Sequence, residues 1–120
     1  MVSEKFLASY YSPKEIEDIV NLVLLKLLER INPLVVILFG SAATDKMTKF
    51  SDLDIAVIVD NISDIKESYK KISNLSQEVK IPIDFLVIDI TNYKIKSEIG
   101  GVFFEAKNFG RVIYKRKDQD

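Results

Sequence analysis

The sequence predicts an α/β fold of the α+β kind, in which a small mixed β-sheet has helices packed against it. Two observations carry this prediction. Apolar, β-branched runs of strand length stand at 34–39, 53–59 and 83–88, and segments with helical periodicity separate them. The expected order is helix, strand, helix, strand, helix, strand, helix, strand. Such an order is typical of a sheet covered by helices.

The first helix is predicted over 13–31. Ser12 is expected as its N-cap, with Pro13 at the first helical position and Glu15 closing a capping box. Asn32-Pro33 should end the helix, because a residue before proline avoids helical geometry. Apolar residues recur at helical spacing, namely Ile16, Ile19, Val20, Val23, Leu24, Leu27, Leu28 and Ile31.

The middle of the chain has clear turn signals. Gly40-Ser41 turns the chain after the first strand, and we expect 42–48 to form a short helix. One long helix is predicted to begin at residue 61 or 63 and to end near residue 80. The strand at 83–88 follows Pro82, which is tolerated at a strand start.

The C-terminal part carries weaker signals. A helix is expected from 92 to about 106, although Gly100-Gly101 weakens it. A helix stop at 108–110 precedes a last short strand at 111–114. The charged tail 115–120 is expected to fray.

Composition limits the class of the protein. The chain has 120 residues, 48% hydrophobic and 29% charged, so we expect a single domain over 1–120. Its net charge of −1 disfavours nucleic acid as a partner. The N-terminal segment carries Glu4 and every apolar run is shorter than a membrane span. We therefore expect no signal peptide and no membrane segment, and a cytoplasmic protein.

The chain contains neither Cys nor His. Their absence excludes disulfides, cysteine-ligated zinc, and Ser-His or Cys-His catalysis. Any metal ion must then be held by carboxylates and other oxygen atoms, which are the ligands that Mg²⁺ and Mn²⁺ prefer.

Three aspartates interrupt the apolar strands. Asp52 immediately precedes the run 53–59, Asp54 lies within it, and Asp84 lies in 83–88. Burying an unpaired carboxylate costs several kcal/mol, so a cation or a substrate is expected to compensate the charge. Residues two apart project from one face of a strand, and Asp84 would join them if the third strand lies beside the second. Two metal ions roughly 3.5–4 Å apart can clamp both oxygens of a phosphoryl displacement.

Gly40-Ser41 follows the strand 34–39 directly and precedes Asp52 by ten intervening residues. Gly40 lets the backbone approach phosphate oxygens, and Ser41 adds a hydroxyl at a helix start, where free amides favour a triphosphate. Taken singly, a Gly-Ser is usually a turn, an Asp-x-Asp a solvated edge or cap, and a lone strand Asp a partner of lysine. Found in this order on apolar strands, they predict a two-metal nucleotidyl-transfer site.

Gly40-Ser41, Asp52-Leu53-Asp54 and a later Asp84 resemble the motif of the DNA polymerase beta superfamily of nucleotidyltransferases. The small size resembles its minimal nucleotidyltransferase (MNT) branch, which is often encoded beside a HEPN-domain protein. The resemblance covers a motif core of 34–114, including the closing Gly-x-Val-Ile-Tyr at 110–114. It implies a polymerase-beta-like nucleotidyltransferase fold.

The resemblance also implies roles. Gly40 and Ser41 would bind the nucleotide phosphates. Asp52 and Asp54 would ligate two Mg²⁺ ions. Asp84 would complete the catalytic metal site and would orient or deprotonate the attacking hydroxyl. The implied reaction moves a nucleoside monophosphate (NMP), with AMP from ATP expected, onto a hydroxyl and releases pyrophosphate. In this branch the acceptor is a tyrosine of a HEPN toxin, which makes the enzyme an antitoxin.

Two positions depart from the family pattern. Thr44 stands where a basic residue is common, and Asp45 replaces a glycine. An acidic side chain beside a triphosphate is unfavourable unless it points away. Lys46 and Lys49 are the candidates for the missing positive charge.

These departures leave alternatives open. One is a non-catalytic antitoxin that neutralises its partner by occlusion, and another is a nucleotidyltransferase for a small molecule or an RNA end. Leu22 and Leu25 widen the apolar stripe of the first helix and indicate a second contact surface, so a homo- or hetero-oligomer is also open.

Overall fold

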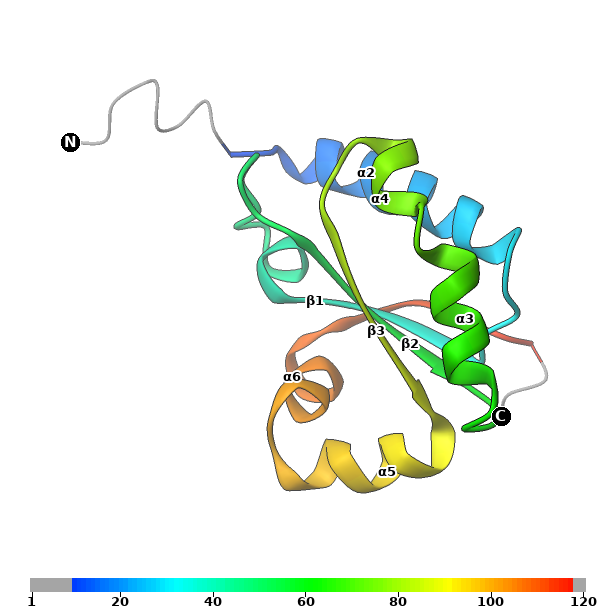
Figure 1. Cartoon of the computed structure of the whole chain (residues 1–120). Helices are drawn as coiled ribbons and strands as arrows, with labels where there is room; N and C mark the ends of the chain where they lie inside the picture. The colour runs from blue at the N-terminus through cyan, green and yellow to red at the C-terminus, as the bar shows by residue number, and fades with distance from the viewer. Residues whose placement is uncertain (1–9, 118–120) are drawn as a thin grey trace.

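A computed structural model of the protein describes residues 10–117 (Figure 1). No helix within this part of the chain is long and apolar enough to cross a bilayer. The elements are, in chain order, α2 (Pro13–Leu28), β1 (Val35–Phe39), the 3₁₀ helix η1 (Gly40–Thr44), β2 (Leu53–Val59), α3 (Asp64–Ile72), α4 (Leu75–Val79), β3 (Ile83–Asp89), α5 (Ile90–Ile99), α6 (Val102–Phe109) and β4 (Arg111–Lys115).

The four strands form one mixed sheet in the order β3-β2-β1-β4. β1 runs antiparallel to both β2 and β4, whereas β2 and β3 are parallel. A parallel pair needs a crossover connection, which α3 and α4 provide. The predicted fold class is confirmed, and so is the expectation that the third strand lies beside the second.

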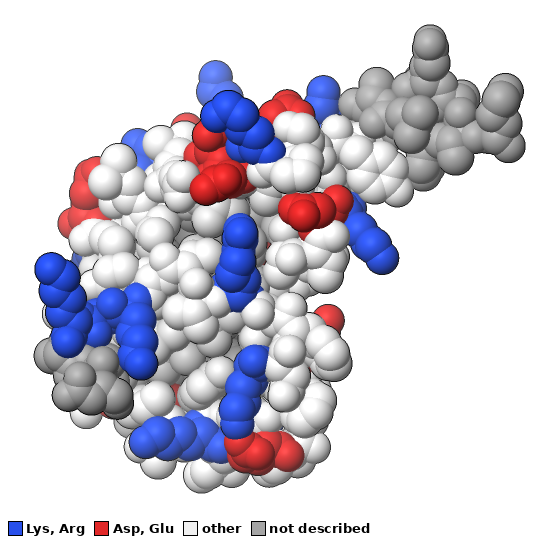
Figure 2. Space-filling view, turned by 180° about the vertical axis from the view of Figure 1, so that it is seen from behind, with Lys and Arg blue, Asp and Glu red and all other residues white. Residues whose placement is uncertain are grey.

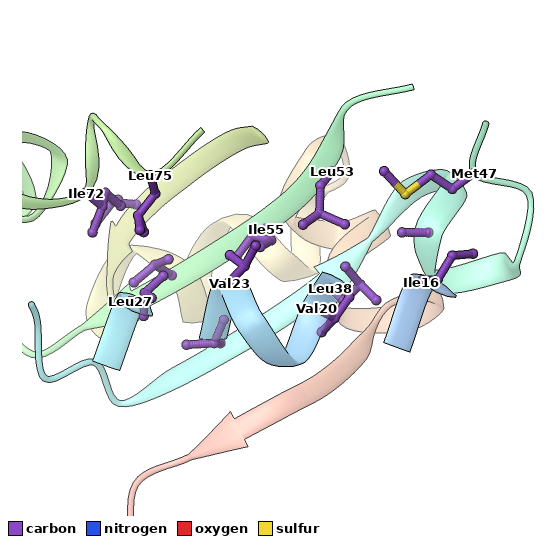
Figure 3. Close-up of a cluster of buried hydrophobic side chains, with 14 of the residues drawn as sticks. Ile16, Val20, Val23, Leu27, Leu38, Met47, Leu53, Ile55, Ile72 and Leu75 are labelled. Carbon is purple, nitrogen blue, oxygen red and sulfur yellow. The ribbon is translucent and has the colours of Figure 1, made fainter. Parts of the chain in front are cut away.

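Helices cover both faces of the sheet (Figure 1). α2, α3 and α4 pack on one face over a large apolar cluster, to which β2 contributes Leu53, Ile55 and Val57. All three side chains are essentially inaccessible to solvent. Figure 3 shows the centre of this cluster, with Ile16, Val20, Val23 and Leu27 from α2, Leu38, Leu53 and Ile55 from the sheet, and Ile72 and Leu75 from α3 and α4.

The opposite face of the sheet carries a second, smaller cluster covered by α5 and α6. Ala56 and Ile58 of β2 belong to it, together with Ala106 of α6. Because side chains alternate along a strand, Asp54 projects from the same face as Ala56. The alternation therefore places Asp54 on the α5–α6 side of the sheet.

The predicted capping box at the start of α2 is present. The Ser12 hydroxyl accepts a hydrogen bond from the Glu15 amide at 3.1 Å, and Glu15 Oε1 accepts one from the Ser12 amide at 2.9 Å. The helix ends at Leu28 and not at residue 31 as predicted. The amides of Arg30 and Ile31 both donate to the Leu27 carbonyl at 3.0 Å, so a tight turn replaces the last helical turn.

The prediction of one long helix between 61 and 80 is wrong, because the segment forms two helices, α3 and α4. The break falls at Ser73 and Asn74. There the Ser73 hydroxyl donates to the Lys70 carbonyl at 3.0 Å, a local bond that competes with continued helix. α4 then ends at Val79, and its C-cap Lys80 adopts a left-handed φ of 60°. The break lets the chain bend back toward the start of β3.

The helix predicted over 92–106 is likewise two helices. α5 and α6 are separated by Gly100 and Gly101, whose φ values are +131° and +84°. The helix stop predicted at 108–110 is confirmed, because α6 ends at Phe109 with Gly110 as its C-cap. A smaller difference concerns 42–48, where the expected short helix is η1, which begins two residues earlier at Gly40.

The start of the charged tail belongs to the fold. Lys115 is the last residue of β4, and the Arg116 amide donates to the Leu34 carbonyl at 2.9 Å. The Arg116 guanidinium also donates to both Asp60 carboxylate oxygens, at 3.0 and 2.9 Å. The expected fraying is therefore wrong for 115–116, and residues 118–120 lie outside the described residues.

Candidate active site

Gly40 lies directly against the carboxylate of Asp54. β1 ends at Phe39, which is paired with Asp54 on β2, so the next residue passes over that side chain. A Cβ atom on Gly40 would sit 3.2 Å from Asp54 Cγ and would overlap Oδ2. The φ of Gly40 is +71°, a conformation that disfavours any side chain. Both features require glycine where the chain leaves β1 for η1.

The three predicted aspartates gather at one end of the β2–β3 pair. Asp54 and Asp84 are direct partners in the parallel register, and Asp52 immediately precedes β2. Asp54 is half-buried, whereas Asp52 and Asp84 are exposed. Within residues 10–117 no Lys or Arg forms an ion pair with any of the three. The structure therefore brings the predicted residues together and leaves their charge uncompensated.

The electrostatics of Asp54 reflect this arrangement. Burial raises the pKa of the Asp54 carboxyl above its usual range, and the negative charges of Asp84, Asp52 and Glu105 raise it further. Both effects penalise the ionised form. A bound cation would reverse the penalty, because an opposite charge nearby favours the ionised carboxylate.

Glu105 is a fourth acidic residue near the site that sequence reasoning missed. It lies on α6, next to Ala106, which packs into the smaller apolar cluster. Its charge acts on Asp54. Nothing in the sequence near Glu105 indicates this role, since only the packing of α6 on the Asp54 face brings the two residues near each other.

The two residues that depart from the family pattern lie at the far end of η1 from Gly40, with Thr44 as its last residue and Asp45 as its C-cap. Asp45 caps the far end of the helix with a left-handed φ of 58° and is exposed. The Ser41 carbonyl accepts the Lys46 amide at 2.8 Å, which closes the turn. Lys49 lies near the start of α2. The hydrogen bonds from Ser12 lower the pKa of the Glu15 carboxyl, and the positive charge of Lys49 lowers it a little further.

The chemistry of the donors fits a divalent cation of the Mg²⁺ type. Asp52, Asp54 and Asp84 supply only carboxylate oxygens, the ligands such ions prefer. As they stand, no three His, Cys, Asp or Glu side chains in residues 10–117 form a group that could hold a metal ion. The β2–β3 pairing holds the backbones of Asp54 and Asp84, while the exposed side chains of Asp52 and Asp84 can rotate.

The structure thus packs Gly40 on Asp54 and sets Asp84 in register beside it, at the end of one mixed sheet. The family model described as "Polymerase beta, Nucleotidyltransferase" matches residues 23–119 of the chain. The chain belongs to this family, which confirms the resemblance seen in the motif. No curated protein matches it.

Solved structures share the fold. A protein from Sulfolobus solfataricus assigned to the nucleotidyltransferases is 17% identical, with a TM-score of 0.58, covering 88% of this chain and 86% of that one. A mutant of the toxin-antitoxin pair MntA-HpeT gives 19% identity and a TM-score of 0.57, covering 82% and 73%. The MNT antitoxin complex with the tri-AMPylated HEPN toxin of Shewanella oneidensis is 18% identical, with a TM-score of 0.51, covering 84% of this chain and 73% of that one.

Proposed function

We propose that this protein transfers an NMP from an NTP to a hydroxyl of a partner protein, with release of pyrophosphate. The observation that carries the proposal is the packing of Gly40 on Asp54, with Asp84 in register beside it. Family membership supplies the class of reaction. A single catalytic domain over 1–120 that acts in the cytoplasm is part of the same proposal.

Each predicted site residue has a role in this reaction. Gly40 and Ser41 would bind the triphosphate at the start of η1, where the first amides of a helix have no partner within the helix. Asp52, Asp54 and Asp84 would hold two Mg²⁺ or Mn²⁺ ions. When bound, such ions neutralise charge that develops on the attacking and leaving oxygens.

Asp84 is proposed to orient the acceptor hydroxyl and to take its proton. The hydroxyl oxygen bonds to the α-phosphorus of the NTP, and the bond from the α-phosphorus to the bridging oxygen breaks. Pyrophosphate leaves with that oxygen. Asp84 suits this role because it is exposed on the edge strand β3, beside the half-buried Asp54.

The structural relatives support a toxin as the acceptor. One is a toxin-antitoxin complex with AMP-PNP, 17% identical with a TM-score of 0.54, and another contains the AMPylated HEPN toxin described above. On this basis we propose ATP as the NTP and a tyrosine of a HEPN-domain protein as the acceptor. The protein would then be the antitoxin of the pair.

The surface charge also supports a protein partner over nucleic acid. On the face seen in Figure 2, Lys and Arg side chains stand in separate groups divided by uncharged surface. Proteins that track a nucleic-acid backbone usually present a continuous basic face or stripe. The net charge of −1 agrees with this reading.

The test is the intact mass of a HEPN-domain protein from the same genome, after incubation with this chain, Mg²⁺ and each NTP in turn. A gain of one or more NMP units with wild type, absent with the Asp52→Asn/Asp54→Asn double variant, is expected. Asp18→Asn is the matched control, because Asp18 is an exposed carboxylate on α2 outside the site. It should transfer like wild type.

A non-catalytic antitoxin is the second candidate. Thr44 and Asp45, which depart from the family pattern, favour it. It predicts that the HEPN-domain protein is bound and silenced with no change in mass, and that the double variant silences it as well as wild type. That outcome would overturn the proposed transfer.

A further inference from the structure

Phe50 is the most exposed large hydrophobic side chain within residues 10–117. It keeps 88% of its surface in contact with solvent, and Ile99 follows at 78%. Single exposed apolar residues are ordinary on protein surfaces. Phe50 differs in its position, because it lies on the loop between η1 and β2, two residues before Asp52.

The turn that presents Phe50 is held by hydrogen bonds on both sides of it. The Thr48 and Ser51 hydroxyls lie 3.1 Å apart, and the Ser51 hydroxyl also accepts the Thr48 amide at 3.1 Å. The Phe50 amide donates to the Thr48 hydroxyl at 3.2 Å, and the Ser51 amide to the Thr48 carbonyl at 3.1 Å. The ring is therefore carried on an organised turn.

The base of the loop is anchored in the core. Met47 is fully buried in the large apolar cluster, and its carbonyl accepts the Tyr11 amide at 3.0 Å. Thr48 forms an isolated β-bridge with Tyr10. These contacts fix one end of the loop, and β2 fixes the other. Phe50 is thus held at a set position relative to Asp52.

One cavity in the described structure lies away from the three aspartates. Its volume is about 230 Å³, and Val59 and Asp60 are among the residues that line it. Val59 stands five residues beyond Asp54 on β2, or roughly 17 Å at the rise of a strand. This cavity therefore does not enclose an acceptor at the site, whose outer carboxylates Asp52 and Asp84 face solvent.

We propose that Phe50 is a docking anchor for the acceptor protein, inserting into an apolar pocket beside the acceptor hydroxyl and so positioning that hydroxyl at the three aspartates of the candidate site. This inference rests on the proposed function and adds how the acceptor is recognised. An aromatic ring on an ordered turn loses little conformational freedom on binding, which is the property of interface anchors. Phe50 is a positioning residue in this scheme, because it does not touch the reacting atoms.

The test compares Phe50→Ser with Ile62→Ser in binding and in transfer. Ile62 is the matched control, since it is 69% exposed and follows the opposite end of β2. The probe is the HEPN-domain protein used above, with its Kd measured by calorimetry and its KM by NMP incorporation. Phe50→Ser should raise both Kd and the acceptor KM by on the order of 10- to 100-fold, with kcat retained, because one aromatic anchor is lost. Phe50→Tyr should largely restore them.

Each other result overturns the inference in a recognisable way. If Phe50→Ser has the same Kd and acceptor KM as Ile62→Ser, Phe50 has no docking role. A raised KM for the NTP with an unchanged acceptor KM would show that Phe50 contacts the nucleotide. If wild type binds the protein without modifying it, the proposed transfer fails, and the Kd values alone still decide whether Phe50 docks. If wild type neither binds nor modifies it, the partner and the docking role are both wrong.

Discussion

Replacing Gly40 with alanine tests the contact at the centre of the candidate site. The φ of +71° costs an alanine about 1–2 kcal/mol in folding free energy. The new methyl carbon would stand 3.2 Å from Asp54 Cγ and would overlap Oδ2, so the carboxylate must move by roughly 1 Å to reach ordinary contact. A displacement of that size at a reacting centre costs on the order of 100-fold in rate. We expect both a less stable protein and a slow one.

Gly101→Ala separates the two effects. Gly101 also has a positive φ, +84°, but a Cβ there would meet nothing within 4 Å. Both variants should lose stability in thermal unfolding followed by circular dichroism, with a fall in Tm of about 4–10 °C for Gly40→Ala. Only Gly40→Ala should lose NMP transfer to the HEPN-domain protein. If both variants transfer at similar rates, the close approach of Gly40 to Asp54 has no catalytic importance.

Three further predictions concern stability and are checked by urea unfolding. Asp54→Asn should gain stability relative to wild type as pH rises. Burial and the neighbouring carboxylates raise the folded pKa of Asp54, so the wild type loses stability as pH rises from the unfolded pKa through the raised folded pKa. Parallel curves of unfolding free energy against pH would contradict this. Arg116→Ala should cost about 0.5–1 kcal/mol at neutral pH. The part of that cost that comes from the Asp60 carboxylate should disappear as pH falls through the folded pKa of Asp60, which the Arg116 hydrogen bond lowers. The hydrogen bond from Arg116 to the Asn32 carbonyl at 3.2 Å does not depend on that pKa, so only a cost that stays constant over this pH range would exclude the ion pair as a source. Leu27→Ala should cost about 2–5 kcal/mol of unfolding free energy, since Leu27 is a fully buried α2 residue packed against the sheet. Leu25 lies on the same helix but is 61% exposed, so Leu25→Ala should cost less than about 0.5 kcal/mol. Equal losses for the two variants would refute the packing described.

Local patterns predicted most of the elements, because each is encoded by neighbouring residues. The capping box of Ser12 and Glu15 and the apolar strand Val35–Phe39 are of this kind. Predictions were wrong where a local bond or backbone geometry interrupted an apolar pattern. The Ser73 hydroxyl splits the helix predicted between 61 and 80, and Gly100-Gly101 splits the one over 92–106. Apolar periodicity continues across both breaks and so does not reveal them.

The end of the chain illustrates a different limit. Lys115 and Arg116 have the composition of a solvated tail, yet Arg116 is bound by Asp60 and by the Leu34 carbonyl. These partners lie more than fifty residues away in sequence. A charge pattern read along the chain carries no information about such a partner.

Local sequence was enough to name the candidate site residues, because each one is recognised by its own chemistry and its neighbours in the chain. Carboxylates in apolar strands, and a glycine where one strand turns into a helix, indicate a phosphoryl-transfer site without coordinates. Which of these residues lie together depends on strand pairing and helix packing. The parallel register sets Asp84 beside Asp54, the β1–β2 pairing lays Gly40 on the Asp54 carboxylate, and the packing of α6 adds the charge of Glu105. Register and helix placement depend on contacts between residues far apart in the chain, so local sequence cannot specify them.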